Sequence, residues 1–389
     1  ILLSIIPDTD LNREMRETLI PLYIPERYKR DEIISAITGD NCNSVSYDLL
    51  KGFGSGNQLT VEENMNMFGY SIDEARRLVV KGGRGNAACT GIAQMATPAQ
   101  KKLPNGQNKP YQGDWQAECF IRWAVSLGFV EYDSTNDACK ISALGRRFAE
   151  CESESDEEKD ILGEAMISYP PACRILELLS EQGHLTKFEI GSQLGFIGEA
   201  GFTSVSQSLY VGGLNSATTT EERTEIRQNF EGSSDKYARM IAGWLCQIGW
   251  VARVEKEVTE RYLGSPHTAT IGQSYMITQR GQTNLNRIRG GTRHGRSVKR
   301  VFWNMLATAA PDANYLRNRR FYTIQSIRTS RKTVEQIKDY LVLNHFDVGE
   351  ATIIDDLKNL VSIGLQVDEN DLGYLIKDEI ECLEIPNDV

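Results

Sequence analysis

The stretch MIAGWLCQIGWVARV (residues 240–254) decides the expected fold. Its apolar residues recur every three or four positions as far as Ile248, Gly249 interrupts the pattern, and an alternating run comes after it. A glycine in this position is typical of a helix that ends in a left-handed cap. The stretch therefore predicts an amphipathic helix that leads directly into a β-strand.

Two other stretches repeat this pattern. They are FIRWAVSLGFVEY (residues 120–132), with Gly128 in the same place, and LKNLVSIGLQVDE (residues 357–369), with Gly364. The three copies are about 120 residues apart, and such regular spacing argues against coincidence.

The segments after the three copies are also alike. CKISALGRRFAE (residues 139–150) and SYMITQRGQTNL (residues 274–285) predict a strand, a turn at Ser/Thr-x-x-Gly and a helix, and YLIKDEIECLEI (residues 374–385) is a weaker third case. Helix, hairpin and helix is the layout of a winged helix, a helix-turn-helix variant. The predicted fold is mainly α with small β wings, arranged as three tandem winged-helix subdomains.

Two shorter helices precede the pattern in the later repeats. RILELLSEQG (174–183) and LTKFEIGSQLGF (185–196) are expected before the second, with Thr186 as an N-cap, and RRFYTIQSIRTS (319–330) and KTVEQIKDYL (332–341) before the third. The expected bounds of the three subdomains are 1–150, 160–286 and 299–389. An acidic linker (151–159) and a basic linker (287–298) are expected between them.

Charge is distributed unevenly along the chain. The formal net charge of the 389 residues is −10, yet the segment from Arg261 to Val334 holds fourteen Lys or Arg and one acid, Asp312. A local surplus of this kind indicates contact with nucleic acid. The alternative is an ordinary solvated surface of helices and loops.

Composition narrows the class of protein. A chain with 40% apolar and 25% charged residues is typical of globular domains, and no apolar run is long enough to cross a bilayer. The opening ILLSIIPD lacks the features of a signal peptide. Eight scattered cysteines and four separated histidines predict reduced thiols in a cytoplasm, with no metal site and no His-based nucleophile.

The second repeat offers candidate base-reading residues in EGSSDKYARMIAGWL (residues 231–245). The expected helix begins near Ser234, with Lys236 on the flank of its apolar stripe and Arg239 almost opposite the stripe. Arg and Lys donate to guanine O6 and N7, and Glu231 accepts from cytosine N4. The alternative is a solvated charge pair beside a capping glutamate.

The repeats are not equivalent. In the third, GEATIIDDLKNLVS (residues 349–362) carries Glu350, Asp355 and Asp356, whose charge would oppose phosphate, so this repeat is expected to pack against another domain. The first presents Trp115 for an apolar contact with DNA. Unlike reading heads on one chain predict a monomer on an asymmetric site.

Several long segments resemble the DNA-recognition part of the FokI family of type IIS restriction endonucleases. They are SYPPACRILELLSEQGHLTKFEIGSQLGF (168–196), GFTS (201–204), EGSSDKYARMIAGWL (231–245), KRVFWNMLAT (299–308) and GDWQAECFIRWAVSLGFVEY (113–132). The resemblance implies three winged-helix subdomains, two on double-stranded DNA and a third that docks a C-terminal nuclease domain. It also implies the asymmetric site GGATG.

The resemblance places base-reading residues on the chain. They are Arg84, Gln100, Trp115, Gln228, Glu231, Lys236 and Arg239. Gln228 departs from the family pattern, which has Asn there, and the family's N-terminal arm has no counterpart in the sequence.

Phosphate contacts are expected from the basic residues around the second linker, because such contacts fix register without reading sequence. They are Arg287, Arg289, Arg293, Arg296, Lys299 and Arg300.

Catalytic residues are not expected in this chain. The nuclease of the family combines Pro-Asp with an acid-x-Lys motif to hold Mg²⁺. Pro-Asp occurs at 7–8 and 311–312, and acid-x-Lys occurs at Glu157-Glu158-Lys159 and at Asp356-Leu357-Lys358, without the hairpin that would join them. We therefore expect a chain that binds DNA and does not cut it by itself, with no cofactor of its own. The alternatives are a tandem winged-helix regulator of transcription or replication, and a scaffold that binds only proteins.

Overall fold

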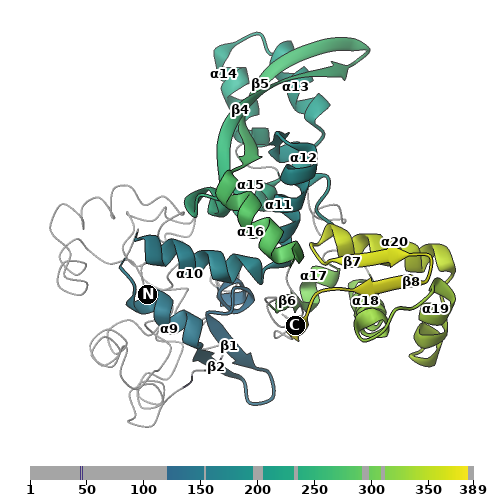
Figure 1. Cartoon of the computed structure of the whole chain (residues 1–389). Coiled ribbons are helices and arrows are strands. Elements are labelled where there is room, and N and C mark those ends of the chain that lie inside the picture. Colours follow the sequence, from purple (N-terminus) through teal and green to yellow (C-terminus); the bar gives the residue numbers. More distant parts are fainter. Residues whose placement is uncertain are drawn as a thin grey trace, which may run out of the picture. The chain divides into compact units, whose positions relative to one another are not determined.

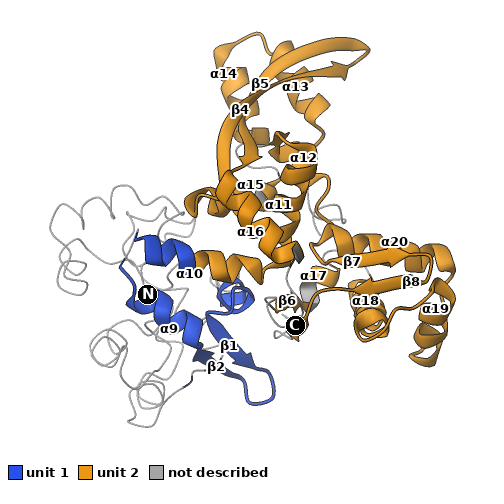
Figure 2. Ribbon diagram, viewed as in Figure 1, with its two compact units in different colours: residues 1–161, 385–389 blue, residues 162–384 orange. Residues whose placement is uncertain are grey.

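The computed structural model describes residues 44, 46, 121–152, 155–195, 205–231, 235–290, 298–307 and 312–383. These residues form a mostly helical structure with small sheets, as expected (Figure 1). The chain divides into two compact units, residues 1–161 with 385–389 and residues 162–384 (Figure 2). Apart from a few terminal residues, the second and third predicted subdomains thus lie within one unit, and their separate bounds remain predictions.

The described part of the first unit is a helix, a hairpin and a helix. A helix that ends at residue 126 leads into the antiparallel strands β1 (Val130–Asp133) and β2 (Ala138–Ile141). Helix α9 (Ala143–Glu150) comes next, and α10 (Asp156–Ile167) runs on into the second unit.

The second unit begins with helices packed on a long hairpin. Its first helices and strand are α11 (Pro170–Gln182), β3 (Leu185–Thr186), α12 (Lys187–Gly191), α13 (Gln207–Ser216), α14 (Thr220–Ile226), the π-helix η2 (Arg227–Glu231) and α15 (Lys236–Gln247). After them come the hairpin strands β4 (Val251–Tyr262) and β5 (Ser265–Ile277), and then α16 (Gln279–Gly290). The sheet order is β3-β5-β4, and all pairs are antiparallel.

The C-terminal part of the second unit repeats the helical arrangement with shorter strands. It contains β6 (Lys299–Phe302), α17 (Trp303–Leu306), α18 (Ala313–Arg328), α19 (Val334–Leu343), α20 (Glu350–Ser362), β7 (Val367–Asn370), β8 (Gly373–Ile376) and β9 (Ile380–Leu383). Strands β7 and β8 form an antiparallel hairpin, whereas β6 and β9 pair in parallel.

The predicted helix ends are confirmed in all three repeats. Gly128, Gly249 and Gly364 have φ values of 76°, 74° and 107°. At each, the glycine N–H bonds the carbonyl three residues back and the next N–H bonds the carbonyl five residues back, at 2.9–3.1 Å. This is the Schellman motif, and it turns the chain from helix to strand in the same way three times.

The turn after the hairpin is also shared by the first two repeats. Ser142 caps α9 by accepting from Gly145 N at 2.9 Å, and Thr278 accepts from Gly281 N at 3.0 Å. A Cβ on Gly145 would lie 2.1 Å from Phe129 O, and one on Gly281 would lie 2.0 Å from the carbonyl oxygen of Trp250. Both glycines are therefore required by close contact with the chain at the start of the hairpin.

Three sequence expectations need correction. Residues 156–159 belong to α10 and 287–290 to α16, so both predicted linkers are partly helical. Acids at the start of α10 and Arg at the end of α16 favour this, because they complement the helix dipole. Residues 380–383, expected to open a helix, instead form β9, where alternating side chains allow pairing with β6.

A separate apolar cluster positions the outer half of the hairpin. Its buried members are Phe188, Tyr210, Val211, Leu214, Val258 and Ile271. They come from α12, α13 and both hairpin strands, and α13 approaches so closely that a Cβ on Gly212 would lie 2.1 Å from the Tyr262 ring. This cluster fixes α13 beside the hairpin and supports η2, whose Phe230 packs against it.

Candidate nucleic-acid interface

The candidate base-reading residues of the second repeat lie at the junction of η2 and α15. We call residues 227–231 and 235–239 the η2–α15 junction. Helix α15 begins at Lys236 after Asp235, which has a φ of 46°, so the helix starts two residues later than expected. Ser234, where the helix was expected to begin, lies outside the described residues.

The structure places four predicted readers at this junction. Gln228 is exposed on η2, and Glu231 at its end is partly buried. Lys236 is the first residue of α15, where only its backbone is described. Arg239 is partly buried, and its Nε is buried without an acceptor among the described residues.

The Glu231 carboxylate is held by two neighbouring elements. Its Oε2 accepts from the Tyr210 hydroxyl of α13 at 2.5 Å, and its Oε1 accepts from the Gln273 backbone N–H of β5 at 2.8 Å. Tyr210 is fully buried, and burial together with the bond to Glu231 raises the pKa of its hydroxyl. The hydroxyl therefore stays a donor at neutral pH, and Glu231 has a fixed orientation.

The backbone of the same segment is held by a buried lysine. Lys187, the first residue of α12, is 0% exposed, and its Nζ donates to the carbonyls of Phe230 and Glu231, at 2.8 Å for Glu231. Burial lowers the pKa of its ammonium to about 8, partly offset by the Asp235 carboxylate. At neutral pH Lys187 is therefore mostly a cation that neutralises the carbonyl end of η2.

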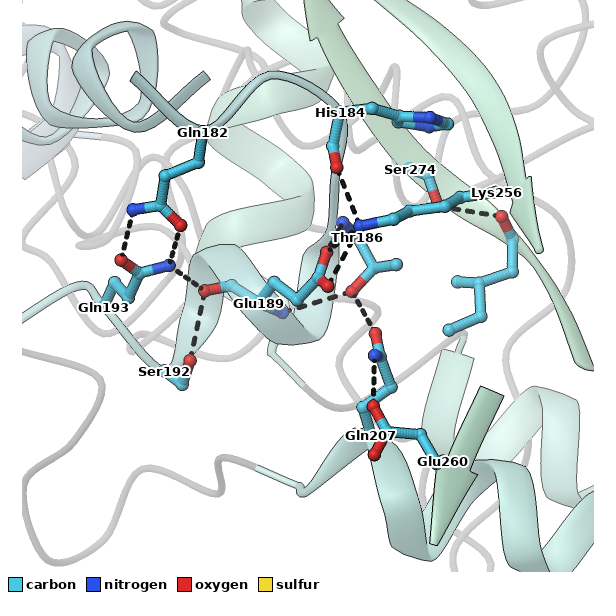
Figure 3. Close-up of polar contacts among 11 residues, drawn as sticks. Gln182, His184, Thr186, Glu189, Ser192, Gln193, Gln207, Lys256, Glu260 and Ser274 are labelled. Carbon is cyan, nitrogen blue, oxygen red and sulfur yellow. Dashed lines mark hydrogen bonds and ion pairs between the residues drawn. The ribbon is translucent and has the colours of Figure 1, made fainter. Parts of the chain in front are cut away.

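A polar network joins α12 to the hairpin and to α13 (Figure 3). Thr186 and Glu189 form the capping box at the start of α12, which confirms Thr186 as the N-cap. Lys256 of β4 donates to both Glu189 oxygens, at 2.8 and 3.0 Å, and to the His184 carbonyl. The Thr186 hydroxyl also donates to Gln207 of α13 at 2.5 Å. These bonds fix the helix that carries Lys187.

The proposed phosphate contacts differ in accessibility. Arg287 is exposed on the last turns of α16, and Arg289 is exposed but paired with Glu181 at 2.8 Å. Arg300 is partly buried and lies 3.4 Å from the Glu381 carboxylate.

Lys299 differs from the others because it is 2% exposed. Its Nζ donates to the Ile167 carbonyl at 2.5 Å and lies 2.9 Å from Cys173 Sγ. An ammonium buried in this way cannot reach phosphate, so we withdraw Lys299 from the phosphate set.

The acidic helix of the third repeat also needs correction. Asp356 does not face outward: it is 1% exposed and accepts from Arg319 at 2.7 and 2.9 Å and from Arg320 at 3.1 Å. Of the three acids on this helix, Glu350 and Asp355 are exposed. The two arginines, counted in the basic segment, therefore stabilise the interior of this subdomain.

The acid-x-Lys motifs do not fit a metal site. Asp356 is committed to two arginines, and Lys159 pairs with Asp156 at 3.0 Å in the first turn of α10. Within the described ranges, no group of three or more His, Cys, Asp or Glu could hold a metal ion. In the same ranges no helix is both long and apolar enough to span a membrane.

Several predicted residues lie outside the described part of the chain. They are Arg84, Gln100, Trp115, Arg293, Arg296, and the Pro-Asp pair at 7–8. The sequence did not indicate the role of Lys187 and Tyr210, two buried residues that donate hydrogen bonds to Glu231. Neither stands out in sequence, because one reads as a first-turn lysine and the other as an ordinary core tyrosine.

Comparison with known families covers most of the chain. Residues 4–151 match the family described as FokI, recognition domain, subdomain 1, and residues 158–263 match FokI, recognition domain, subdomain 2. Residues 306–372 match the FokI D3 domain. The three matches come one after another in the order of the predicted repeats.

Curated relatives agree with these matches. The chain is 41% identical over 306 residues to the type II restriction enzyme FokI of Planomicrobium okeanokoites, which covers 78% of this chain and 52% of the relative. It is 30% identical over 284 residues to the type II restriction enzyme StsI of Streptococcus sanguinis, with 70% and 47% covered. The chain thus spans about half the length of these relatives.

Solved structures give the same result. The structure of restriction endonuclease FokI has a TM-score of 0.74 at 33% identity, over 100% of this chain and 62% of that one. The structure of FokI bound to DNA has a TM-score of 0.74 at 31% identity, with 98% and 61% covered. The chain therefore belongs to the FokI family of type II restriction enzymes and is a FokI-like recognition domain.

Proposed function

We propose that this chain recognises double-stranded DNA in a sequence-specific way, so that a nuclease domain joined to its C-terminal side cuts at a distance from the site. In this proposal the first two subdomains are winged helices that read the asymmetric sequence GGATG, and the chain acts as a monomer. The similarity to a FokI structure bound to DNA supports the choice of ligand.

One observation carries the proposal: side chains with different hydrogen-bonding groups, an amide, a carboxylate and a guanidinium, all belong to the η2–α15 junction. Gln228 suits adenine N6 and N7, Arg239 suits guanine O6 and N7, and Glu231 suits cytosine N4. The start of α15 adds the positive end of a helix dipole toward phosphate. Arg84, Gln100, Trp115 and Lys236 complete the proposed set of base-reading residues.

The third subdomain is proposed to dock the nuclease domain. In this subdomain Asp356 of α20 forms an ion pair with Arg319 inside the fold. Helix α19 ends in Val342 and Leu343, whose side chains are 47% and 79% exposed. The Mg²⁺ chemistry of cutting would belong to the nuclease domain. A cytoplasmic location is part of the same proposal.

The test is fluorescence anisotropy of the chain with duplexes that contain GGATG or a scrambled sequence, at two salt concentrations. Binding to GGATG about a thousandfold tighter than to the scrambled duplex is expected. Equal, steeply salt-dependent binding to both duplexes would refute GGATG as the recognition sequence of this chain. Selection of a site with two-fold symmetry from random duplexes would favour a regulator instead.

A further inference from the structure

Two buried polar side chains form hydrogen bonds to the η2–α15 junction from the protein interior. Lys187 of α12 and Tyr210 of α13 are both 0% exposed, and both bond to Glu231. Their burial excludes direct contact with DNA in this conformation. Their bonds nevertheless end on the residue that carries one of the proposed reading groups.

The two hydrogen bonds to the Glu231 carboxylate restrict the directions from which it can accept a further hydrogen bond. Each carboxylate oxygen has two lone pairs, and Tyr210 and the Gln273 N–H each use one on a different oxygen. One lone pair per oxygen remains, at a fixed angle. A fixed acceptor rejects a base that lacks the matching donor, whereas a mobile glutamate can reorient to find another partner.

The bonds to the backbone restrict the segment itself. Lys187 satisfies the carbonyls of Phe230 and Glu231 at the end of a π-helix, where carbonyl groups otherwise lack partners. Its Nζ also lies 4.6 Å from the centre of the Phe188 ring, which adds a cation–π contact. The lysine therefore anchors the end of η2 to α12.

We propose that Lys187 and Tyr210 are positioning residues for sequence recognition: together they fix Glu231 and the end of η2 from inside, before DNA binds. The inference rests on the proposed function, which assigns base reading to Glu231. It adds a source of specificity that makes no contact with DNA.

Tyr210→Phe is the sharpest variant, because it removes one hydroxyl and keeps the ring against Phe188 in the apolar cluster. We expect affinity for GGATG to fall about tenfold, which is about 1.4 kcal/mol, with little change on scrambled DNA. The matched control is Tyr374→Phe, which removes a tyrosine hydroxyl that donates to Glu369 at 2.8 Å in the third subdomain. This control should leave the ratio of the two affinities unchanged.

Lys187→Met and Lys187→Arg test the second residue. The Met variant should lose specific affinity, and the Arg variant should restore part of it if the positive charge is what holds the two carbonyls. Because Lys187→Met leaves two carbonyls without their donor, it should also lower stability. Leu178→Ala serves as a control for stability alone, since Leu178 is fully buried in α11. An equal loss of specificity in Leu178→Ala and Lys187→Met would overturn the role of Lys187.

The pH profile separates positioning from stability. The groups that face Lys187 are Glu231 on η2 and Asp235 and Arg239 at α15. As pH rises through about 8 the ammonium loses its charge and holds the carbonyls less firmly, so specific affinity should fall more in the wild type than in Lys187→Arg. The stability contribution has the opposite sign: the unfolded lysine keeps its proton to a higher pH, so this group makes folding more favourable above about pH 8.

Amide hydrogen exchange of the free protein distinguishes this inference from the proposed function. Tyr210→Phe and Lys187→Met should speed exchange at residues 227–231 and 235–239, while Tyr374→Phe should not. Unchanged exchange and an unchanged affinity ratio in both variants would overturn the inference. If the wild type does not prefer GGATG, the proposed function fails, and the exchange data then decide whether the two residues position the junction.

Discussion

The buried Asp356 allows a prediction whose magnitude can be worked out from its contacts. Its carboxylate accepts from Arg319 and Arg320, and Arg320 also donates to the Leu306 carbonyl. The group thus links α18, α20 and the end of α17. Asp356→Asn removes the negative charge that faces the buried guanidinium group of Arg319 and the partly buried one of Arg320.

The expected cost is large because an unpaired buried charge remains. Removal of one partner of a buried ion pair costs about 3–5 kcal/mol, and since asparagine keeps one acceptor oxygen we expect the lower end, about 3 kcal/mol. Asp355→Asn is the matched control: its side chain is 79% exposed and lies 4.0 Å from Lys358. A surface change of this kind should stay within about 0.5 kcal/mol.

Amide hydrogen exchange of the residues in α18 and α20 measures this loss of stability in the two helices that Asp356 joins. About 3 kcal/mol corresponds to roughly a hundredfold loss of protection in Asp356→Asn. Asp355→Asn should show almost none. If the two variants lose protection equally, or if Asp356→Asn changes it by less than about threefold, the buried network does not hold these helices together and the reasoning is wrong.

Three further predictions concern the interface and the shared turn. Arg239→Ala should cost about 1–3 kcal/mol on GGATG and little on scrambled DNA, by anisotropy; equal losses would make Arg239 a phosphate contact. Arg287→Ala should weaken binding to both duplexes alike and lower the salt slope by about one, and an unchanged slope would remove it from the interface. Gly281→Ala should lower the melting temperature, because its Cβ would meet the Trp250 carbonyl at 2.0 Å, whereas Gly243→Ala, with nothing within 4 Å, should not.

The repeated architecture could be predicted from sequence because its signals are local. A glycine that ends a helix, and a Ser or Thr that caps the next one, act through bonds over three to five residues, as at Gly249 and Thr278. The apolar stripe of α15 was also predictable, and Ile241, Leu245 and Ile248 are buried as expected. Patterns of this range can be read along one chain without knowledge of its tertiary structure.

The residues that support the site could not be predicted, because their partners are distant in sequence. Lys187 bonds to carbonyls more than forty residues away, and Asp356 bonds to Arg319 across thirty-seven. A single charged residue in a helical pattern gives no indication of whether it is solvated or paired inside. The strand β9 escaped prediction for the same reason, since its partner β6 lies about eighty residues earlier.

The basic segment shows how far a charge count can mislead about a surface. Among the residues that the structure describes, at least eight of its fourteen cations pair with a carboxylate or donate to a backbone carbonyl of the same chain; they are Arg289, Lys299, Arg300, Arg317, Arg319, Arg320, Arg328 and Arg331. Cations engaged in this way release fewer counterions on binding DNA, because each would first have to exchange its partner for phosphate. A large part of the local surplus therefore makes contacts within the fold of the C-terminal part. Under the proposed function, discrimination between sequences would depend on a few residues at the η2–α15 junction. Lys187 and Tyr210, which bond to Glu231 there, are two buried groups that lie outside the basic segment.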